Sequence, residues 1–413
     1  MIKKICSVLL GGLLLFNLSG CTSKESSVNK DMVTIKFSWW GTEDRYERTM
    51  KVIKLFEEKN PDIKIKPEYG EWTGFAKRMK MKILGNDEAD VMQLNYDWLT
   101  TYSKDGTGFY DINKVSDEID LSNFSEDYLS YGRKNGVLNA IPISTNGKIM
   151  FYNKQIVEEN ISTWDDLINS APKDGTYIVS TGEFDLWSMC MAYEQGKTGK
   201  AFISSDGSLG FAKEDIVDLL SFYKTLVDKK IVPLTLAKDG NGEFDKNNAG
   251  ISVGWTNDAQ KVSKNMNKFN TEIEVSAFPS VPGQKPITYV KPTSLYAISK
   301  NTEHAKEAAR FMNFMLNDTE AAEILGLDRG VPASKASYNT LKDKGILEGV
   351  QYDANSIITD TNEVLLSPYY ENTQIKNICY EAIEEITYGK SSPQDCAEKT
   401  YNDLIKVLET LVK

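Results

Sequence analysis

The chain alternates strand-like and helix-like segments, and this order restricts it to an α/β fold. Residues 33–37 alternate apolar and polar side chains, as a half-buried strand does. A helical pattern begins at Asp44 and ends at Pro61, because proline cannot continue the hydrogen-bond ladder of a helix. The next segments are a strand at 63–65, a helix at 75–84 and a strand at 90–94. Strands separated by helices predict a largely parallel sheet.

The same pattern continues along the chain, which at 413 residues is long enough for two to three domains. Hydrophobic residues make up 41% of it, enough for a sizeable core or two. Further strands are expected at 138–142, 147–152, 176–180, 249–253, 274–278 and 294–298. Helices are expected after an N-cap at Thr163, at 213–229, 302–316 and 319–325, and over most of the chain beyond residue 355. These elements predict two α/β lobes.

Charge and cysteine content exclude several classes of function. A net charge of −11 argues against general affinity for nucleic acid, which needs basic patches. The single histidine, His304, excludes sites that need two histidines, and the absence of a C-x-x-C pair argues against a thiol redox site or a zinc ribbon. Three cysteines follow Cys21, so at least one has no partner within the chain, and a Cys379–Cys396 disulfide stays open.

Residues 1–20 have the pattern of a secretory signal peptide. Two lysines precede an apolar run at 5–16 that is too short to span a bilayer. The Leu-Ser-Gly-Cys stretch at 18–21 resembles a bacterial lipobox, which implies cleavage before Cys21 and lipidation of that cysteine. The alternative is a plain signal peptide with an incidental cysteine. Residues 21–32 are expected to form a flexible tether, so the protein is expected on the extracellular face of the cell membrane.

Aromatic residues repeatedly follow the predicted strands, where ligands of open α/β sheets bind. They are Trp39, Trp40, Tyr96, Trp98, Trp187 and Trp255. Flat rings beside polar groups suit a carbohydrate, because the C–H faces of a pyranose stack on aromatic rings and its hydroxyls need hydrogen-bond partners. Each tryptophan alone also fits a core or capping position. Three or four of the seven tryptophans are expected to face the ligand.

Six stretches of the sequence resemble family 1 of the extracellular solute-binding proteins of carbohydrate ABC importers. They are residues 38–69, 71–112, 137–154, 163–167, 291–318 and 326–335. The resemblance implies a two-lobed periplasmic-binding-protein-like fold of type II, with the ligand in a cleft between lobes joined by crossover strands. It assigns residues 33–143 and 295–345 to the first lobe and residues 144–294 and 346–413 to the second. The crossings are expected near 140–144 and 290–296.

Within that family, three motifs are most similar to those of receptors for oligogalacturonides and related pectin fragments. They are Trp39-Trp40-Gly41 followed by Arg45, Glu68-Tyr69 followed by Trp72, and Trp98 in Asn-Tyr-Asp-Trp-Leu. By this resemblance Arg45 pairs with a uronate carboxylate; the alternative is an exposed arginine paired with Glu43 or Glu47. Glu71 departs from the pattern of those receptors and would repel a uronate. A neutral oligosaccharide or a host-glycan fragment therefore stays open.

The resemblance and the strand-end positions together give a set of expected ligand-binding residues: Trp39, Trp40, Arg45, Trp72, Tyr96, Asp97, Asn146, Glu183, Asp185, Trp187, Trp255 and Tyr296. Glu183 and Asp185 form a pair of acids of the kind that a glycosidase also uses. We favour the alternative that they accept hydrogen bonds from sugar hydroxyls, because the resemblance is to non-enzymes. No catalytic residue is predicted.

Cofactor motifs in the sequence are incomplete. Gly196-Lys197 lacks the glycine that a phosphate loop needs five residues earlier, where Met191 stands. Residues 239–245 resemble a calcium loop but have Phe244 in place of the glycine at its sixth position, so a polar surface loop is favoured and a weak calcium site stays open. We expect no cofactor and no metal.

The expected partners are an oligosaccharide, the permease subunits of an ABC transporter, and the membrane through the lipid on Cys21. The protein is expected to be a monomer that does not bind nucleic acid. Two functions from other classes stay open at this point: a surface carbohydrate-active enzyme, and an adhesin or sensor that binds glycans without transport.

Overall fold

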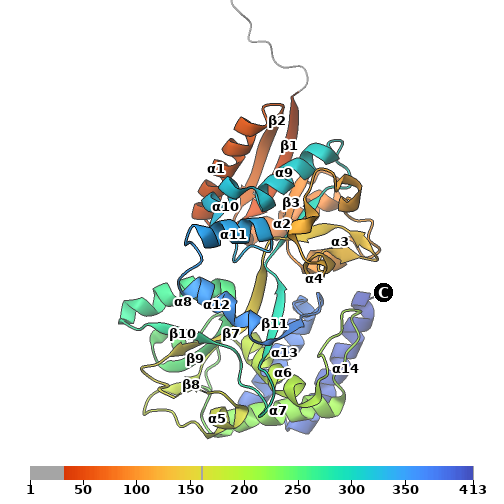
Figure 1. Cartoon of the computed structure of the whole chain (residues 1–413). Coiled ribbons are helices and arrows are strands. Elements are labelled where there is room, and N and C mark those ends of the chain that lie inside the picture. Colours follow the sequence, from red (N-terminus) through yellow and green to blue (C-terminus); the bar gives the residue numbers. More distant parts are fainter. Residues whose placement is uncertain (1–31, 160, 413) are drawn as a thin grey trace, which may run out of the picture.

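The computed structural model describes residues 32–159 and 161–412 and shows two lobes, one above the other in Figure 1. This arrangement confirms the predicted two-lobed α/β fold. The predicted signal peptide, Cys21 and residues 22–31 of the tether lie outside the described residues. Within the described ranges, every helix is either too short or too polar to span a bilayer.

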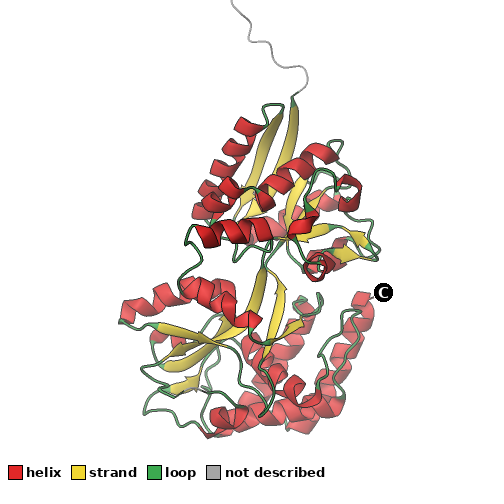
Figure 2. Ribbon diagram, in the orientation of Figure 1, coloured by secondary structure: helices red, strands yellow, loops and turns green. Residues whose placement is uncertain are grey.

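The first lobe is built on a five-stranded sheet with the strand order β2-β1-β3-β12-β6. The strands are β1 (Val33–Trp40), β2 (Ile63–Gly70), β3 (Val91–Leu94), β6 (Ala140–Pro142) and β12 (Leu295–Ile298). The first three run parallel, and β12 is antiparallel to both β3 and β6. The carboxyl ends of β1, β2 and β3 therefore meet at one edge of the sheet, which faces the second lobe (Figures 1 and 2).

Helices cover both faces of the first sheet (Figure 2). One face packs on α1 (Glu43–Lys59), α9 (Ala305–Asn317) and α10 (Thr319–Leu325), and the other on α2 (Trp72–Leu84) and α3 (Asp97–Tyr102). α4 (Glu126–Ser130), α11 (Lys335–Asp343) and a small ribbon of β4 (Arg133–Lys134) and β5 (Val137–Leu138) complete the lobe. α1 ends before Pro61, as predicted, and α10 has the predicted bounds.

The second sheet has the strand order β13-β11-β7-β9-β8, and β10 pairs with β7 outside this path. Its strands are β7 (Thr145–Asn153), β8 (Tyr177–Val179), β9 (Ala249–Trp255), β10 (Ile273–Ser276), β11 (Ile287–Pro292) and β13 (Asn362–Leu365). The prediction of a largely parallel sheet is wrong here, because β7 is antiparallel to β9, β10 and β11. β7 enters the lobe and β11 leaves it, so these neighbouring strands run in opposite directions.

The helices of the second lobe also lie on both sides of its sheet. α5 (Trp164–Asn169), α6 (Glu183–Thr198), α7 (Lys213–Asp228), α13 (Thr373–Thr387) and α14 (Pro393–Val412) enclose the larger core, whereas α8 (Ala259–Met266) and α12 (Val350–Thr359) pack on the other side. Thr163 caps α5 in a capping box with Asp166, as predicted. The cysteines at 190, 379 and 396 are buried free thiols, so the Cys379–Cys396 disulfide is absent from the structure.

The two lobes are joined by an antiparallel ribbon that keeps one register across the boundary. In the first lobe β6 pairs with β12 through Pro142 and Leu295, and in the second β7 pairs with β11 through Thr145 and Pro292. Between them, the amide of Ile143 donates to the carbonyl of Ser294 at 3.0 Å, and the amide of Thr293 donates to the carbonyl of Ser144 at 2.9 Å. The ribbon therefore passes from lobe to lobe without a break in pairing.

Trp187 lies at the centre of the second-lobe core. It is on α6, its exposed fraction is 0%, and its ring meets that of Phe202 edge-on at 5.5 Å. A cavity of the size of an indole ring cannot be refilled by partial relaxation of close-packed neighbours.

We expect Trp187→Ala to lower the free energy of unfolding by about 3–5 kcal/mol, the usual loss for a buried large aromatic side chain. The measurement is urea unfolding followed by far-ultraviolet circular dichroism. Tyr388→Ala is the matched control, because Tyr388 is 53% exposed and its removal should change stability by less than about 0.5 kcal/mol. Wild-type stability in the Trp187 variant would show that this ring is not part of the core.

Candidate functional site

Four aromatic side chains form a group at the carboxyl ends of the first-lobe strands. We call them the first-lobe aromatic cluster: Trp40, Trp72, Phe75 and Trp98. The ring centroid of Trp40 lies 5.1 Å from that of Trp72 and 5.9 Å from that of Trp98. The Trp72 and Trp98 rings stack at 6.2 Å with 14° between their planes. Because Trp72 is 47% exposed, the cluster presents an aromatic surface to solvent.

In the second lobe, the ring of Trp255 at the end of β9 is contacted by the ammonium groups of two lysines. Lys148 Nζ is 4.3 Å from the ring centroid and Lys291 Nζ is 4.4 Å from it. Strand register explains the contact: Lys148 is paired directly with Trp255, and Lys291 with Asn146 two residues earlier in β7. All these side chains therefore lie on one face of the sheet, and cations over an indole ring are stabilising.

Each of the two lysines also forms an ion pair within the second lobe. Lys148 binds Asp185 of α6, and Lys291 binds Glu371, which precedes α13. The lysine side chains are only 3% and 12% exposed. Burial alone would raise the pKa of Glu371, but the charge of Lys291, with those of Lys376 and Lys148, lowers that pKa below its ordinary value. Glu371 is therefore held as a carboxylate.

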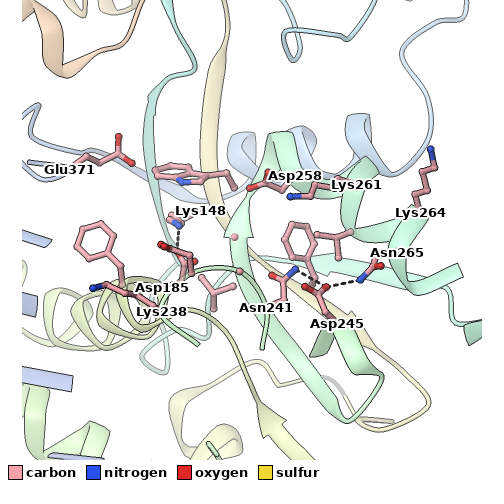
Figure 3. Close-up of a pocket in the computed structure, with 18 of the residues that line it drawn as sticks. Lys148, Asp185, Lys238, Asn241, Asp245, Asp258, Lys261, Lys264, Asn265 and Glu371 are labelled. Atoms are coloured by element: carbon pink, nitrogen blue, oxygen red, sulfur yellow. Dashed lines mark hydrogen bonds and ion pairs between the residues drawn. The ribbon is translucent and has the colours of Figure 1, made fainter. Parts of the chain in front are cut away.

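A hollow of about 570 Å³ opens beside the Trp255 ring, within the usual size range of small-ligand pockets. Figure 3 shows Lys148, Asp185, Asp258, Lys261 and Glu371 around it. Burial raises the pKa of the Asp258 carboxyl, and the nearby Lys148 and Lys261 oppose this rise. All the residues that line this hollow belong to the second lobe.

Asp97 of the first lobe lies within electrostatic reach of the ion pair of Lys291 and Glu371 in the second. Burial, and then repulsion by Glu371, raise the pKa of the Asp97 carboxyl to about 6, while Lys291 partly opposes the rise. Asn95 Nδ2 donates a hydrogen bond of 2.7 Å to Asp97 Oδ1. Asp97 is followed directly by Trp98 of the first-lobe aromatic cluster, and both lie at the start of α3.

The model of a family described as bacterial extracellular solute-binding protein matches residues 51–350. The chain belongs to this family. The multiple sugar-binding protein of Streptococcus mutans is 25% identical to it, over 86% of this chain and 85% of that protein. The family model covers the crossings between the lobes and most of both sheets.

Two solved structures are also similar to this solute-binding protein. A periplasmic oligogalacturonide-binding protein of Yersinia enterocolitica, in complex with saturated digalacturonic acid, has a TM-score of 0.81 and 29% identity over 92% of this chain and 100% of that chain. A chain described as a de novo designed esterase has a TM-score of 0.84 and 28% identity over 92% of this chain and 100% of that chain.

Three predicted ligand-binding rings of this solute-binding protein are instead core residues. Trp39 and Trp187 are each 0% exposed and Tyr296 is 1% exposed. Trp39 stacks on Phe37, since residues two apart in a strand share a face, whereas Trp40 points to the opposite face. Tyr296 meets the same Phe37 ring edge-on. The prediction that these three rings face the ligand is therefore wrong for this structure.

Arg45 differs from both roles that the sequence left open. Its Nε donates to Asp328 Oδ2 at 2.9 Å and its Nη2 to the Asp328 carbonyl at 2.7 Å, so it pairs neither with Glu43 nor with Glu47. Burial, followed by the charge of Arg329, lowers the pKa of Arg45, and Asp328 opposes this shift. The guanidinium fork is occupied within the first lobe and is not offered to a uronate.

The remaining predicted polar residues divide between the hollow and the core. Asp185 lines the hollow, but Glu183 is 4% exposed, and burial, with the nearby Glu384 next in importance, raises its pKa to about 7. Asn146 Oδ1 accepts hydrogen bonds from Thr256 Oγ1 at 2.8 Å and from the amide of Asn257, so it holds the turn after β9. Tyr96 is buried at the start of α3.

The loop at 239–245, which resembles a calcium loop in sequence, is held by amide groups. Asp245 Oδ1 accepts hydrogen bonds from Asn241 Nδ2 at 3.0 Å and from Asn265 Nδ2 at 2.8 Å (Figure 3). In the described part of the chain, no three His, Cys, Asp or Glu side chains come together as a metal site would require.

Sequence reasoning missed Lys148, Lys291, Glu371 and Asp258. Only the first carried a signal: a lysine directly before the apolar run 149–152 of β7, a strand whose residues are all buried. A charge in such a strand needs a partner, which Asp185 supplies. Lys291, Glu371 and Asp258 carried no such signal, because only the tertiary structure brings them to the hollow and to Trp255.

We expect Arg45→Ala to lower the free energy of unfolding by about 3 kcal/mol, because it leaves the partly buried Asp328 without its main cation. The contact of Asp328 with Arg329 at 3.2 Å limits the loss. Arg310→Ala is the control, since its pairs with Asp62 and Glu118 are more exposed and should contribute no more than about 1 kcal/mol. Thermal and urea unfolding measure the difference. An Arg45 variant with unchanged stability but no sugar binding would contradict this assignment and show that Arg45 contacts the ligand.

Proposed function

We propose that this protein captures an oligosaccharide between its lobes and delivers it to the permease of an ABC transporter. Membership of the solute-binding family supports the class of function. The names of two relatives support a sugar as the ligand: one is a multiple sugar-binding protein, and the other is an oligogalacturonide-binding protein. The charge of the sugar was left open by the sequence.

The observation that carries the proposal is the placement of aromatic rings on both sides of the boundary between the lobes. Trp40, Trp72 and Trp98 lie at the carboxyl edge of the first sheet, and Trp255 lies at the end of a second-lobe strand beside the hollow. Indole rings offer flat apolar area with little loss of conformational entropy. A sugar ring stacks on such a face through its C–H bonds, while Asp97, Asp185 and Asp258 accept hydrogen bonds from its hydroxyls.

Closure follows from the way the lobes are joined. The ribbon of β6–β7 and β11–β12 lets the lobes rotate as rigid bodies. The change in backbone dihedral angles that this rotation needs is confined to a few residues near Ser144 and Thr293. A sugar that contacts both lobes favours the closed state by its differential affinity. The permease then recognises the closed, loaded protein.

The protein is held at the outer surface of the membrane in this proposal. The lipobox-like residues 18–21 place a lipid on Cys21, and residues 22–32 link the anchor to β1. We propose a monomer, because the residues of a single chain line the whole hollow and no second copy is needed to complete it.

We assign no enzymatic activity to this site. Of the two acids that a glycosidase would use, Asp185 is bound to Lys148, and Glu183 does not line the hollow. Incubation with oligosaccharides followed by chromatography should return each sugar unchanged, and product formation would contradict a receptor.

We expect Trp255→Ala to weaken sugar binding by about 1–3 kcal/mol, or about 5- to 150-fold in Kd, because one stacking face is lost. Calorimetry would use the oligosaccharide that gives the largest thermal shift in a screen of neutral, amine-bearing and acidic di- to tetrasaccharides. Tyr388→Ala is the control, since Tyr388 follows α13, about 20 Å along the helix from Lys376 beside the hollow. Equal affinity in both variants would show that the Trp255 ring does not contact the sugar.

A further inference from the structure

Helix α2 of the first lobe concentrates positive charge on the surface of an acidic protein. Its 13 residues include Lys77, Arg78, Lys80 and Lys82 and no acidic residue, whereas the whole chain has a net charge of −11. Among the described residues, Lys82 alone of these four cations forms an ion pair, with Glu68 at 2.6 Å. The other cations of α2 are therefore available to an anionic partner outside the chain.

The same helix carries the two most exposed large apolar side chains of the described residues. Leu84 is 67% exposed and Met81 is 65% exposed. Lys77, Lys80, Met81 and Leu84 recur at helical spacing on the exposed side of α2, and we call these four side chains the α2 basic face. The opposite side of the helix is buried through Phe75. Lysines interspersed with apolar side chains suit a membrane surface, where phosphates meet the ammonium groups and the acyl boundary accepts the apolar groups.

The C-terminal end of α2 lies at the end of the first lobe where the chain enters. β2 and β3 both run parallel to β1, so the helix that connects them returns to the start of these strands. The loop after α2 is fixed beside β1: the amide of Lys36 donates to Asp90 Oδ2 at 2.8 Å, and Lys36 Nζ lies 3.4 Å from Asp87 Oδ1. β1 begins shortly before, at Val33, on the side of the first lobe that points away from the second lobe (Figure 1).

The proposed lipid anchor brings a membrane within reach of this face. Residues 22–32 separate Cys21 from β1, and a chain of this length spans at most about 40 Å. Because the lipid already holds the protein at the bilayer, the α2 basic face meets the membrane at a high effective concentration and needs only weak affinity of its own. Each cation next to an anionic membrane surface strengthens binding about fivefold.

We propose, on the basis of the proposed lipid anchor, that the α2 basic face binds the surface of an anionic membrane. Lys77 and Lys80 contact lipid phosphates, and Met81 and Leu84 enter the boundary between headgroups and acyl chains. This second contact orients the first lobe on the bilayer. Closure over the sugar is then carried out by movement of the second lobe.

The test measures the accessibility of lysines in the whole lipidated protein, reconstituted in vesicles. One set of vesicles contains phosphatidylcholine with about 30% phosphatidylglycerol, and the other contains phosphatidylcholine alone. A membrane-impermeant acetylating reagent at low dose, followed by mass spectrometry, gives the rate at which each lysine reacts. Lys77 and Lys80 should react at least about threefold more slowly on the anionic vesicles, and this difference should shrink at about 0.5 M salt. Lys54, 79% exposed on α1 at the other face of the first sheet, is the internal control and should react equally on both.

A charge-reversed variant, Lys77→Glu with Lys80→Glu, tests the contribution of the lysines. Glutamate has nearly the helix propensity of lysine, so α2 is retained. The readout is oxidation of Met81 by dilute peroxide, to which exposed methionines are susceptible. Anionic vesicles should slow this oxidation at least about threefold in the wild type and leave it unchanged in the variant. Lys54→Glu is the matched control and should keep the protection of Met81.

Sugar binding separates this inference from the proposed receptor function. The substituted lysines are exposed and do not line the hollow, so Kd for the sugar should stay within about twofold of the wild-type value in both variants. Loss of sugar affinity in the charge-reversed variant would place the α2 basic face in the binding site and contradict its assignment to the membrane.

Three further results would overturn the inference. Equal reaction of Lys77 and Lys80 on both kinds of vesicle would show that the face does not bind anionic lipid. Protection that requires the permease in the vesicle would assign the face to a protein partner. Protein that does not float with the vesicles in a density gradient would contradict the proposed anchor on Cys21, and this inference with it, without bearing on sugar capture.

Discussion

The whole arrangement depends on a group of hydrogen bonds where the two crossing segments of the chain meet the loop between α10 and α11. Besides the ribbon pairing, Ser144 Oγ and Thr293 Oγ1 are 2.6 Å apart, and Ser144 Oγ also donates to the carbonyl of Arg329. The amide of Ala333 donates to the carbonyl of Ile143 at 3.0 Å. Gly330 lies beside this group with φ of +90°, and a Cβ there would be 2.9 Å from Ser144 Oγ, so only glycine fits without strain.

This joint explains why the binding groups are where they are. It directs the carboxyl edge of the first sheet toward the second lobe (Figure 1), whose sheet carries Lys148, Lys291 and Trp255 on one face. Aromatic rings dominate the first face, and matched charges dominate the second. Buried ion pairs contribute little net stability, because desolvation offsets their attraction. We therefore infer that the ion pairs of the second lobe serve to hold the indole ring and the hydrogen-bond acceptors in place before the ligand binds.

Much of this could be predicted from sequence, and the failures have physical causes. The strand–helix alternation predicted the fold and the strand-end positions of Trp40 and Trp255. It failed at Trp39, because the adjacent residue of a strand faces the other way. It failed at Trp187 because α6 is buried on nearly all sides and shows no amphipathic period, so the helix was not recognised. The match of Lys291 to Glu371 joins residues 80 positions apart and leaves no local pattern.

The central claim is that one sugar binds both lobes and closes them about the ribbon. Small-angle X-ray scattering of the protein with and without its tightest-binding oligosaccharide tests this most directly. The account predicts a smaller radius of gyration in the saturated protein, together with a narrower distribution of interatomic distances, because the lobes rotate toward each other. Saturating binding, shown by calorimetry on the same samples, with an unchanged scattering profile would contradict it and would confine the sugar to one lobe.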